Sequence, residues 1–517
     1  MRCATVVLAA LALAACGGGG GASDPSSGSS SSASSSSSPS SSSSSSSSSA
    51  GSGGTVPLAT CQALVEDAGL NWRDAGLSDQ EVVECLWRTL GEPVGFGEGT
   101  TGGYDPNGSR LVVVSAGPGA QAEQRILEAI GSPEPTWIVF DKANPPRDIA
   151  MYRLWCSDAA VRAALGGASV EQCLDHRAWC AANGIGDEAA CKHEFFNVRL
   201  NDGALPIRNP MIDSHTTLDG RGVSTRVLFS GFAIGADSNG ASTHVSENVI
   251  VTNLYFEGAG HVEDHELDPD MLRTTGESHR VWIHQNTFDT TGDSAFDAKV
   301  GAYGITISFN RVHNVKRATL HGSSDSRTIN EQITTTMHNN LFVTTDDAYS
   351  LLGNTLRRVP LIRRGQSHMF NNVFYGYRKD LLSVRVGGRV LFEDNMFLNR
   401  ADNSEGDDID YWVENLLRDF REGGLEIRGS HVWYATPECR PYGSPGDLTA
   451  SYGSTPDMLA QYSAATRARI EQNRFVVGPE LVEYVLATAG KGGRPPYVSP
   501  ISPGRDALIA QAPATCQ

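Results

Sequence analysis

The chain has 517 residues, with 41 Lys and Arg against 59 Asp and Glu, for a formal net charge of −18. This charge excludes nucleic acid and an anionic bilayer as partners of the molecule as a whole, so a polyanion must meet a local cationic surface. The length fits several domains or one elongated repeat architecture, and the patterns below favour the second.

The N-terminus carries an export signal. Arg2 precedes an apolar run at 6–15 that is too short to span a bilayer. The residues before Cys16 resemble the lipobox of bacterial lipoproteins, which implies that residues 1–16 are a lipoprotein signal peptide and that Cys16 is lipidated. Residues 17–55 are mostly Gly and Ser and predict a disordered tether. We expect an exported protein, secreted or lipid-anchored to the cell envelope (the outer membrane or cell surface), that touches membrane only through this anchor.

Ten cysteines are present, and two of them, Cys3 and Cys16, precede the tether. The even number that remains, after an export signal, predicts disulfides. Zinc-type spacing is missing. Proximity along the chain suggests that Cys61 pairs with Cys85 and that Cys439 pairs with Cys516. The pairing of the middle four stays open: Cys156, Cys173, Cys180 and Cys191.

Residues 61–90 predict a helical segment, in which Ser78 and Glu81 form a capping box ahead of an apolar run. An open end of a β-solenoid exposes unpaired strand groups, which must be covered. We therefore expect this segment to act as an N-terminal helical cap.

One short pattern recurs through the centre of the chain: an asparagine two residues before an aromatic or aliphatic residue, following a β-rich run. Successive asparagines lie 23 to 33 residues apart, which suits one solenoid coil with variable loops. Asparagine tolerates the left-handed conformation, and its amide can bond a stacked neighbour. An antiparallel sandwich is less favoured because hairpin dipeptides do not punctuate the runs. The pattern occurs at Asn253, Asn286, Asn310, Asn340, Asn372 and Asn395.

Several motifs appear in one order along residues 56–517. Together they resemble the pectate lyase family (polysaccharide lyase family one). The resemblance implies an all-β fold, a right-handed parallel β-helix, acting as a monomer in calcium-assisted β-elimination of polygalacturonate, the homogalacturonan of plant pectin. The motifs are Thr217-Leu218-Asp219-Gly220-Arg221-Gly222, the run 248–254, Val281-Trp282-Ile283, the run 305–310, the run 320–325, and Arg358-Val359-Pro360-Leu361-Ile362-Arg363.

The same resemblance implies the site residues. Four aspartates fall where the family binds calcium, and hard oxygen ligands suit this ion. Arg358 matches the base that removes the C5 proton of a galacturonate, while three other arginines match substrate-binding positions. An arginine base needs a lowered pKa, which nearby cations favour. The expected metal ligands are Asp268, Asp270, Asp293 and Asp297, and the expected substrate-binding residues are Arg273, Arg317 and Arg363.

The chain departs from the family pattern at three places. Arg317 replaces a lysine, which resembles the pectin lyases that cleave methyl-esterified pectin. His284 and Gln285 replace an aspartate and a histidine, and we interpret them as a structural pair holding the turn beneath the site. A Cys-bearing helical insertion, residues 151–201, has no counterpart and either walls the cleft or covers the solenoid.

Three alternatives to a pectate lyase stay open. They are a pectin lyase, a non-catalytic β-helix that binds acidic polysaccharide, and a β-helix glycoside hydrolase using paired carboxylates. The last is disfavoured because Gly-His-Gly and Arg-x-Lys elements are missing from the sequence.

Overall fold

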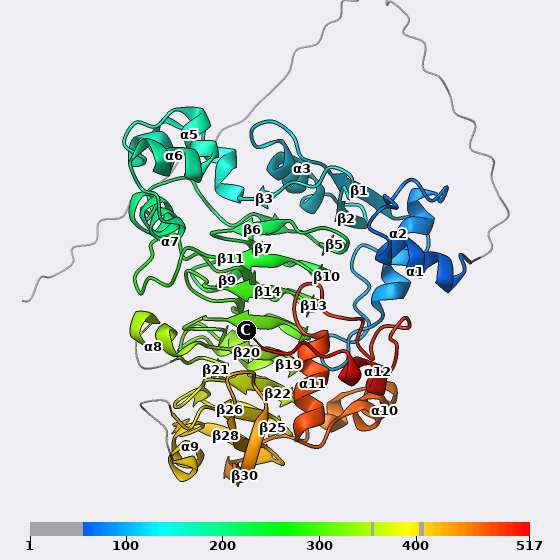
Figure 1. Cartoon of the computed structure of the whole chain (residues 1–517), viewed down its shortest axis with the longest axis vertical. Helices are drawn as coiled ribbons and strands as arrows, with labels where there is room; N and C mark the ends of the chain where they lie inside the picture. Colours follow the sequence, from blue (N-terminus) through cyan, green and yellow to red (C-terminus); the bar gives the residue numbers. More distant parts are fainter. Residues whose placement is uncertain (1–54, 353–355, 403–407, 517) are drawn as a thin grey trace, which may run out of the picture. The chain divides into compact units, whose positions relative to one another are not determined.

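Three long sheets run through the computed structural model, which describes residues 55–352, 356–402 and 408–516 (Figure 1). The predicted signal peptide, Cys16 and nearly all of the predicted tether lie outside these ranges. Within them the sheets have eleven, ten and eight strands, named here sheets A, B and C. Strands from one sheet follow strands from another in sequence, so the chain winds through all three in each coil.

The strands are short. Sheet A contains β1 (Arg110–Val114), β2 (Thr136–Phe140), β5 (Thr216–Asp219), β10 (Glu247–Thr252), β13 (His279–His284), β16 (Tyr303–Ser308), β19 (Thr334–His338), β22 (Gln366–Phe370), β25 (Gly388–Glu393), β28 (Gly423–Arg428) and β31 (Ala450–Gly453). Sheet B contains β3 (Asp148–Ile149), β6 (Arg226–Leu228), β11 (Tyr255–Glu257), β14 (Thr287–Asp289), β17 (Arg311–His313), β20 (Leu341–Val343), β23 (Val373–Tyr375), β26 (Met396–Asn399), β29 (His431–Ala435) and β30 (Pro441–Asp447).

Sheet C contains β4 (Met211–Ile212), β7 (Phe232–Ile234), β12 (Leu272–Thr274), β15 (Phe296–Ala298), β18 (Leu320–His321), β21 (Leu361–Arg363), β24 (Ser383–Arg385) and β27 (Asp419–Phe420). A separate pair joins β8 (Ala236–Ser238) to β9 (Ala241–His244). Apart from that pair and the antiparallel strands β30 and β31, all described pairings are parallel. The structure therefore confirms the parallel β-helix.

In the interior of the β-helix, side chains of similar type stack on one another from one coil to the next. Side chains alternate between the two faces of a strand, so the inward set of each coil lies on the inward set of the next. Parallel strands covered on both faces favour β-branched and aromatic residues. One buried column of sheet A runs through Val251, Ile283, Ile307, Met337, Met369, Phe392 and Ile427.

The recurring asparagines form a ladder at the turn from sheet A to sheet B. The side-chain amide of Asn286 donates to Asn310 Oδ1 at 3.2 Å, and the chain of bonds continues through Asn340 and Asn372 to Asn395 at 2.9–3.0 Å. This confirms the stacking role. The left-handed conformation, however, belongs to the preceding residue, as at Phe309 with φ 56°. Asn253 is itself such a preceding residue, because Leu254 occupies the ladder position and donates to Asn286.

Two helices cover the ends of the coil stack, and neither of them lies in the segment 61–90 that was predicted to form the cap. Helix α3 (Gln121–Ile130) buries Ile126 and Ile130 in the main core at the N-terminal end. Helix α9 (Ile409–Asn415) contributes Trp412 at the opposite end (Figure 1). An N-terminal helical cap is thus present, but α3 forms it, and residues 61–90 lie elsewhere.

Helices α1 (Leu58–Glu66) and α2 (Asp79–Leu90) instead pack on the outer face of sheet A. The predicted capping box at Ser78 and Glu81 is present. The C-terminal helices are α10 (Ala464–Asn473), α11 (Pro479–Thr488) and α12 (Arg505–Ala510). They share a second core with α1 and α2. This core includes sheet A residues such as Trp137 and Trp282 and extends onto sheet B, where α11 contacts β23.

Disulfides join Cys61 to Cys85 and Cys439 to Cys516, as chain proximity suggested, and the middle four cysteines pair as Cys156–Cys173 and Cys180–Cys191. The insertion is helical as predicted. Its elements are η1 (Met151–Trp155), α4 (Ala159–Ala164), α5 (Val170–Leu174), α6 (His176–Ala182), α7 (Glu188–Lys192) and η2 (His193–Arg199). Shorter helices elsewhere are η3 (Thr328–Gln332), α8 (Asp346–Leu352) and η4 (Leu459–Gln461). Within the described ranges, every helix is too short or too polar to cross a membrane.

Candidate active site on the outer face of sheet C

Sheet C brings together residues that the sequence separates by tens of positions. Arg273 on β12 pairs in register with Asp297 on β15. Their flanking residues, such as Leu272 and Phe296, point into the main core. Because side chains alternate along a strand, Arg273 and Asp297 lie on the outer face.

Three of the predicted metal ligands form one cluster. Carboxylate oxygens of Asp268, Asp270 and Asp293 lie within 4.8 Å of one another. Asp293 Oδ1 is buried without a hydrogen-bond partner among the described residues. Burial and the neighbouring carboxylates raise the pKa of Asp270 to about 7 and that of Asp293 to about 8. Such a group of repelling carboxylates has the chemistry of a hard-cation site.

Lys299 was not predicted, and it lies among these carboxylates. Its ammonium is 2.9 Å from Asp270, 2.8 Å from Asp297 and 3.8 Å from Asp268. Burial lowers the pKa of Lys299, but the carboxylates of Asp270 and Asp297 outweigh it and raise that pKa overall. The sequence did hold a signal, because Lys299 follows Asp297 by two residues and so continues the same strand face.

The other predicted ligands differ in position. Asp297 lies outside the three-carboxylate cluster, and its Oδ1 accepts the backbone N–H of Leu320 at 2.7 Å. Asp268 joins the cluster and pairs with Arg273 at 3.2 Å. Arg273 also lies 3.8 Å from Asp270. The predicted substrate-binding Arg273 is therefore held beside the carboxylates.

Arg358 lies in the turn before β21. Its φ of 62° is left-handed, a conformation that costs a non-glycine residue about 1 kcal/mol or more. The turn is fixed because the Arg358 carbonyl accepts from Thr319 N–H at 2.8 Å and buried Val359 donates to Leu381. Burial lowers the pKa of Arg358, and Arg357 and Arg363 add to this, while Asp293 and Asp297 oppose it. The pKa of the predicted base is thus shifted in the direction that favours its neutral form, and the carboxylates of Asp293 and Asp297 lie near enough to oppose that shift.

Arg363 and Arg317 lie on either side of Arg358. Arg363 pairs with Asp325 and donates to the Gly322 carbonyl at 3.1 Å. Arg317 is bridged to Arg357 and forms an ion pair with Glu263, which the sequence did not single out. Burial, with Arg358 and Arg357, lowers the pKa of Arg317 to about 10.

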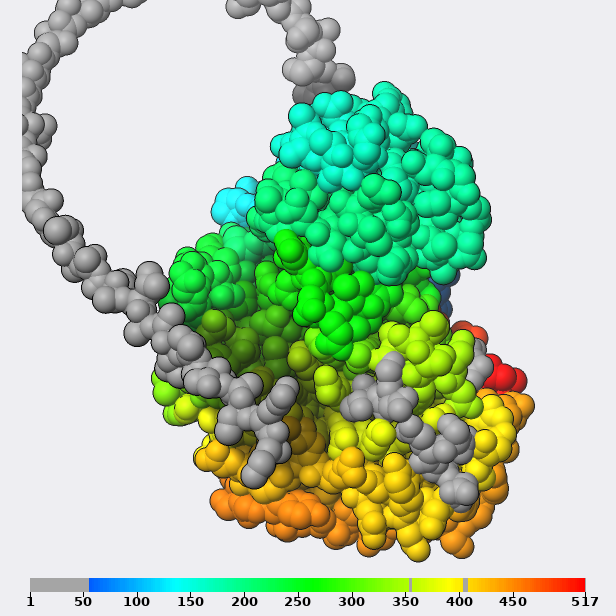
Figure 2. All heavy atoms as spheres, turned by 90° about the vertical axis from the view of Figure 1, so that its left-hand side faces the viewer, coloured from blue at the N-terminus to red at the C-terminus, as the bar shows by residue number. Residues whose placement is uncertain are grey.

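The insertion packs against the loop that carries Asp268 and Glu263. The buried side chain of Asn197 donates to the carbonyls of Ala259 at 2.8 Å and Gly260 at 2.9 Å. Phe196 stacks on His265 with ring centroids 5.3 Å apart. Figure 2 shows the insertion, in turquoise, projecting above the green coils. The insertion thus buttresses a site loop, a role that the sequence left open.

His284 and Gln285 lie at the end of a sheet A strand and not on sheet C. Buried His284 contacts the hydroxyl of Ser308 through Nδ1 at 3.1 Å. Gln285 donates to the carbonyls of Thr488 and Arg494 at 2.9 and 3.0 Å, which fastens the C-terminal loop. The pair is structural as predicted, but it does not lie beneath the site.

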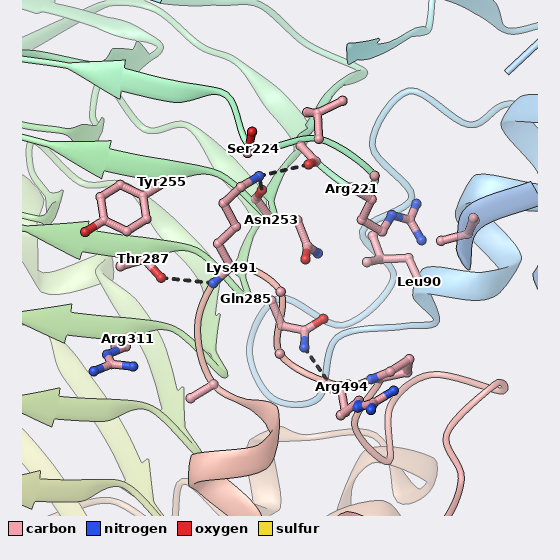
Figure 3. Close-up of a pocket in the computed structure, with 18 of the residues that line it drawn as sticks. Leu90, Arg221, Ser224, Asn253, Tyr255, Gln285, Thr287, Arg311, Lys491 and Arg494 are labelled. Atoms are coloured by element: carbon pink, nitrogen blue, oxygen red, sulfur yellow. Dashed lines mark hydrogen bonds between the residues drawn. The ribbon is translucent and has the colours of Figure 1, made fainter. Parts of the chain in front are cut away.

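A crevice of about 970 Å³ also lies elsewhere on the molecule. It lies between sheet B and the loop 489–501, and we name it the C-terminal crevice. Lys491 spans it, donating to the carbonyls of Gly220 at 3.0 Å and Asn253 at 2.8 Å (Figure 3). Arg221 and Arg311, which also line it, bind acceptors of the protein itself, and none of the predicted site residues lines it.

One face of this parallel β-helix thus joins clustered carboxylates to arginines. The family model described as pectate lyase matches residues 207–410. The chain is 29% identical over 270 residues to pectate lyase B of Dickeya chrysanthemi, covering 47% of this chain and 66% of the relative. It is 33% identical over 200 residues to pectate lyase 1 of Pectobacterium carotovorum, covering 35% and 49%. The chain thus spans about half to two thirds of the length of these relatives, and the similarity to pectate lyases lies in part of the chain.

Among solved structures, pectate lyase II from Xanthomonas campestris superposes with a TM-score of 0.41 at 21% identity, covering 78% of this chain and 98% of that one. A mutant of a Bacillus subtilis pectate lyase gives a TM-score of 0.45 at 18% identity, covering 79% and 98%.

Proposed function

We propose that this protein cleaves polygalacturonate by β-elimination on the outer face of sheet C. One observation carries the proposal: the carboxylates of Asp268, Asp270 and Asp293 cluster within 4.8 Å of one another on a face that they share with Arg273 and Arg358. The carboxylate cluster favours a bound cation and the arginines favour a bound anion. A uronate polymer with a divalent metal supplies both.

Calcium is the metal we propose, held by Asp268, Asp270 and Asp293. The orphaned Asp293 oxygen and the spacing of the three carboxylates support the fit. When bound, the ion supplies positive charge that offsets the negative charge developing on the substrate. Arg273 pairs with the proposed ligand Asp268, and Lys299 pairs with the proposed ligand Asp270 and with Asp297, so these cations fix the positions of the carboxylates.

Arg358 acts as the base in this proposal. Its guanidine takes the proton from C5 of a galacturonate, the released electron pair forms a C4–C5 double bond, and the bond from C4 to O4 breaks. The lowered pKa of Arg358 supports this role, since a base must be populated in its neutral form. Arg363 and Arg317 bind substrate carboxylate, with Arg317 exchanging Glu263 for the uronate.

The test is a turnover assay on the purified protein with polygalacturonate and calcium. We expect ultraviolet absorbance from the unsaturated product, suppressed by a chelator. Fully methyl-esterified pectin, assayed in parallel, separates the pectin lyase alternative. New reducing ends without absorbance would instead establish a hydrolase, and binding without either product would establish a binding module.

Cell-surface attachment through Cys16 is a separate proposal, supported by the lipobox-like sequence. The four disulfides fit an oxidising compartment. Metabolic labelling with a radioactive fatty acid should mark the wild type and not a Cys16→Ser variant. Equal labelling of both would contradict it.

A further inference from the structure

Glu263 lies on the loop between β11 and β12 and contacts two cations that precede sheet C on another coil. Its Oε1 is 2.6 Å from the ammonium of Lys316, and its Oε2 pairs with the guanidinium of Arg317. Within the described part of the chain, Lys316 and Arg317 form ion pairs with no other carboxylate. A carboxylate of the protein thus binds the guanidinium that, in the proposed function, binds a uronate.

Glu263 covers these two cations and is itself accessible. The side chains of Lys316 and Arg317 are 15% and 11% exposed, whereas that of Glu263 is 47% exposed. An ion pair whose carboxylate is open to solvent contributes little to stability, so a second carboxylate can displace the first at small cost. Glu263 therefore competes with an anionic substrate for Arg317 without blocking the site.

The backbone is fixed on both sides of Glu263. Before it, Val262 donates its N–H to the carbonyl of Gly292 at 3.2 Å. After it, Glu266 donates its N–H to Oδ1 of Asn201, at the end of the insertion, at 2.6 Å. Displacement of the carboxylate therefore needs only a different rotamer of the Glu263 side chain, while the loop stays in place. The insertion thus holds this glutamate at the site.

We propose that Glu263 determines how strongly the site discriminates between free and methyl-esterified galacturonate. The inference rests on the proposed function for the identity of the polymer. A free uronate carboxylate displaces Glu263 and takes over Lys316 and Arg317. A methyl ester has no charge, so Glu263 remains and the two cations keep their partner.

The physical reason is the cost of an unpaired charge. A mostly buried cation without a partner is unfavourable, and Lys316 and Arg317 would be left so beside an uncharged ester if Glu263 were absent. Glu263 removes this cost for esterified sugars. In exchange it weakens the binding of polygalacturonate, because each free carboxylate must first break the ion pairs that Glu263 makes.

The experiment compares wild type with Glu263→Gln, which keeps the size of the side chain and removes its charge. Asp264→Asn is the matched control, since Asp264 is exposed on the same loop and pairs with no cation among the described residues. For each protein, kcat and KM are measured on polygalacturonate and on highly methyl-esterified pectin. Binding of a long oligogalacturonate is measured by calorimetry without calcium, and thermal unfolding establishes that each variant is folded.

In Glu263→Gln, we expect KM and Kd for the de-esterified substrates to fall about 3- to 10-fold with kcat unchanged, because a competing charge-assisted contact is lost. KM on esterified pectin should not fall, so the ratio of the two kcat/KM values rises in favour of polygalacturonate. Unchanged or higher KM and Kd in folded Glu263→Gln, an equal fall on both polymers, or the same fall in Asp264→Asn would overturn the inference.

Failure of the proposed function gives a different result. If wild type binds the oligogalacturonate without cleaving polygalacturonate, the lyase activity is excluded, while the Kd values of wild type and Glu263→Gln still test the competition. If wild type neither cleaves nor binds, the inference about Glu263 fails as well.

Discussion

The face of sheet C and the C-terminal crevice are both basic hollows, yet their charges are arranged differently. In the crevice, three of the cations are bound to partners within the protein: Lys491 donates to two backbone carbonyls, Arg221 pairs with buried Asp219 at 2.6 Å, and Arg311 donates to the Cys516 carbonyl. On sheet C, by contrast, three carboxylates crowd together with only Lys299 and Arg273 beside them, and Arg363 stands opposite Arg385.

This difference shows that the volume of a hollow does not identify the functional site of this protein. The crevice has a volume of about 970 Å³, whereas the hollow on sheet C that Arg358 and Arg363 line has a volume of about 520 Å³. Buried polar groups are ordinarily satisfied, and groups left repelling or unpaired need a separate explanation. The ion pairs of sheet C offset its charge only in part, and we propose that ligands offset the rest, whereas the bonds made in the crevice hold the C-terminal loop in place. Substitutions in the two regions should therefore affect different measurements.

The largest effect is expected for Arg358→Ala. Removing the base should lower kcat by about 1,000-fold, within the range for general bases. Calcium binding, measured by calorimetry, should remain because Arg358 is not a ligand. If Arg358→Ala turned over substrate at the wild-type rate, Arg358 would be excluded as the base. The control is Arg428→Ala, since Arg428 is an exposed arginine on β28 that pairs with Glu426.

Asp293→Asn should weaken calcium binding by about 100-fold, since it removes one ligand from a three-carboxylate cluster. The metal-free protein should not lose stability, because burial and neighbouring carboxylates already disfavour the charged form of Asp293. Calorimetry with calcium and thermal unfolding in chelator measure the two effects. A destabilised metal-free protein with normal calcium affinity would show that Asp293 is structural.

Asn197→Ala tests how far the insertion positions the site. We expect calcium affinity to fall about 10-fold, as for other outer-shell substitutions, because the loop carrying Asp268 loses two hydrogen bonds. Excess calcium should restore kcat. Arg199→Ala is the control, since Arg199 pairs with Glu194 on the same helix and leaves the loop untouched. Equal calcium affinity in the two variants would show that the insertion covers the solenoid without positioning the site.

Lys491→Met should affect stability and leave turnover within about 2-fold. Burial lowers the pKa of Lys491 from 10.5 to about 8, although Asp219 opposes the shift. Between pH 8 and 10.5 the unfolded chain then binds more protons than the folded one, so folding gains up to about 3 kcal/mol from Lys491 as pH rises.

Methionine cannot titrate, so the stability of wild type relative to Lys491→Met should increase between pH 7.5 and 10, as measured by urea unfolding. Exposed Arg494 offers the control Arg494→Ala, which should change neither stability nor turnover. A pH-independent difference would mean that Lys491 does not titrate in this range.

Much of the fold was predictable because its signals are local. The asparagine steps and β-rich runs indicated the solenoid, and Ser78 with Glu81 indicated the start of a helix. The end cap was misplaced, because amphipathic α2 could bury its apolar side equally well on the outer face of sheet A. Nothing local to α2 distinguishes these two surfaces.

The amino-acid sequence by itself determined the coil repeat and the order of the motifs, since each depends on neighbours within one coil. The tertiary structure alone decided which residues share the face of sheet C: Lys299 among the aspartates, Glu263 on Arg317, and Arg385 opposite Arg363. Loops of unequal length separate the coils, so only the parallel register of stacked strands determines which side chains meet.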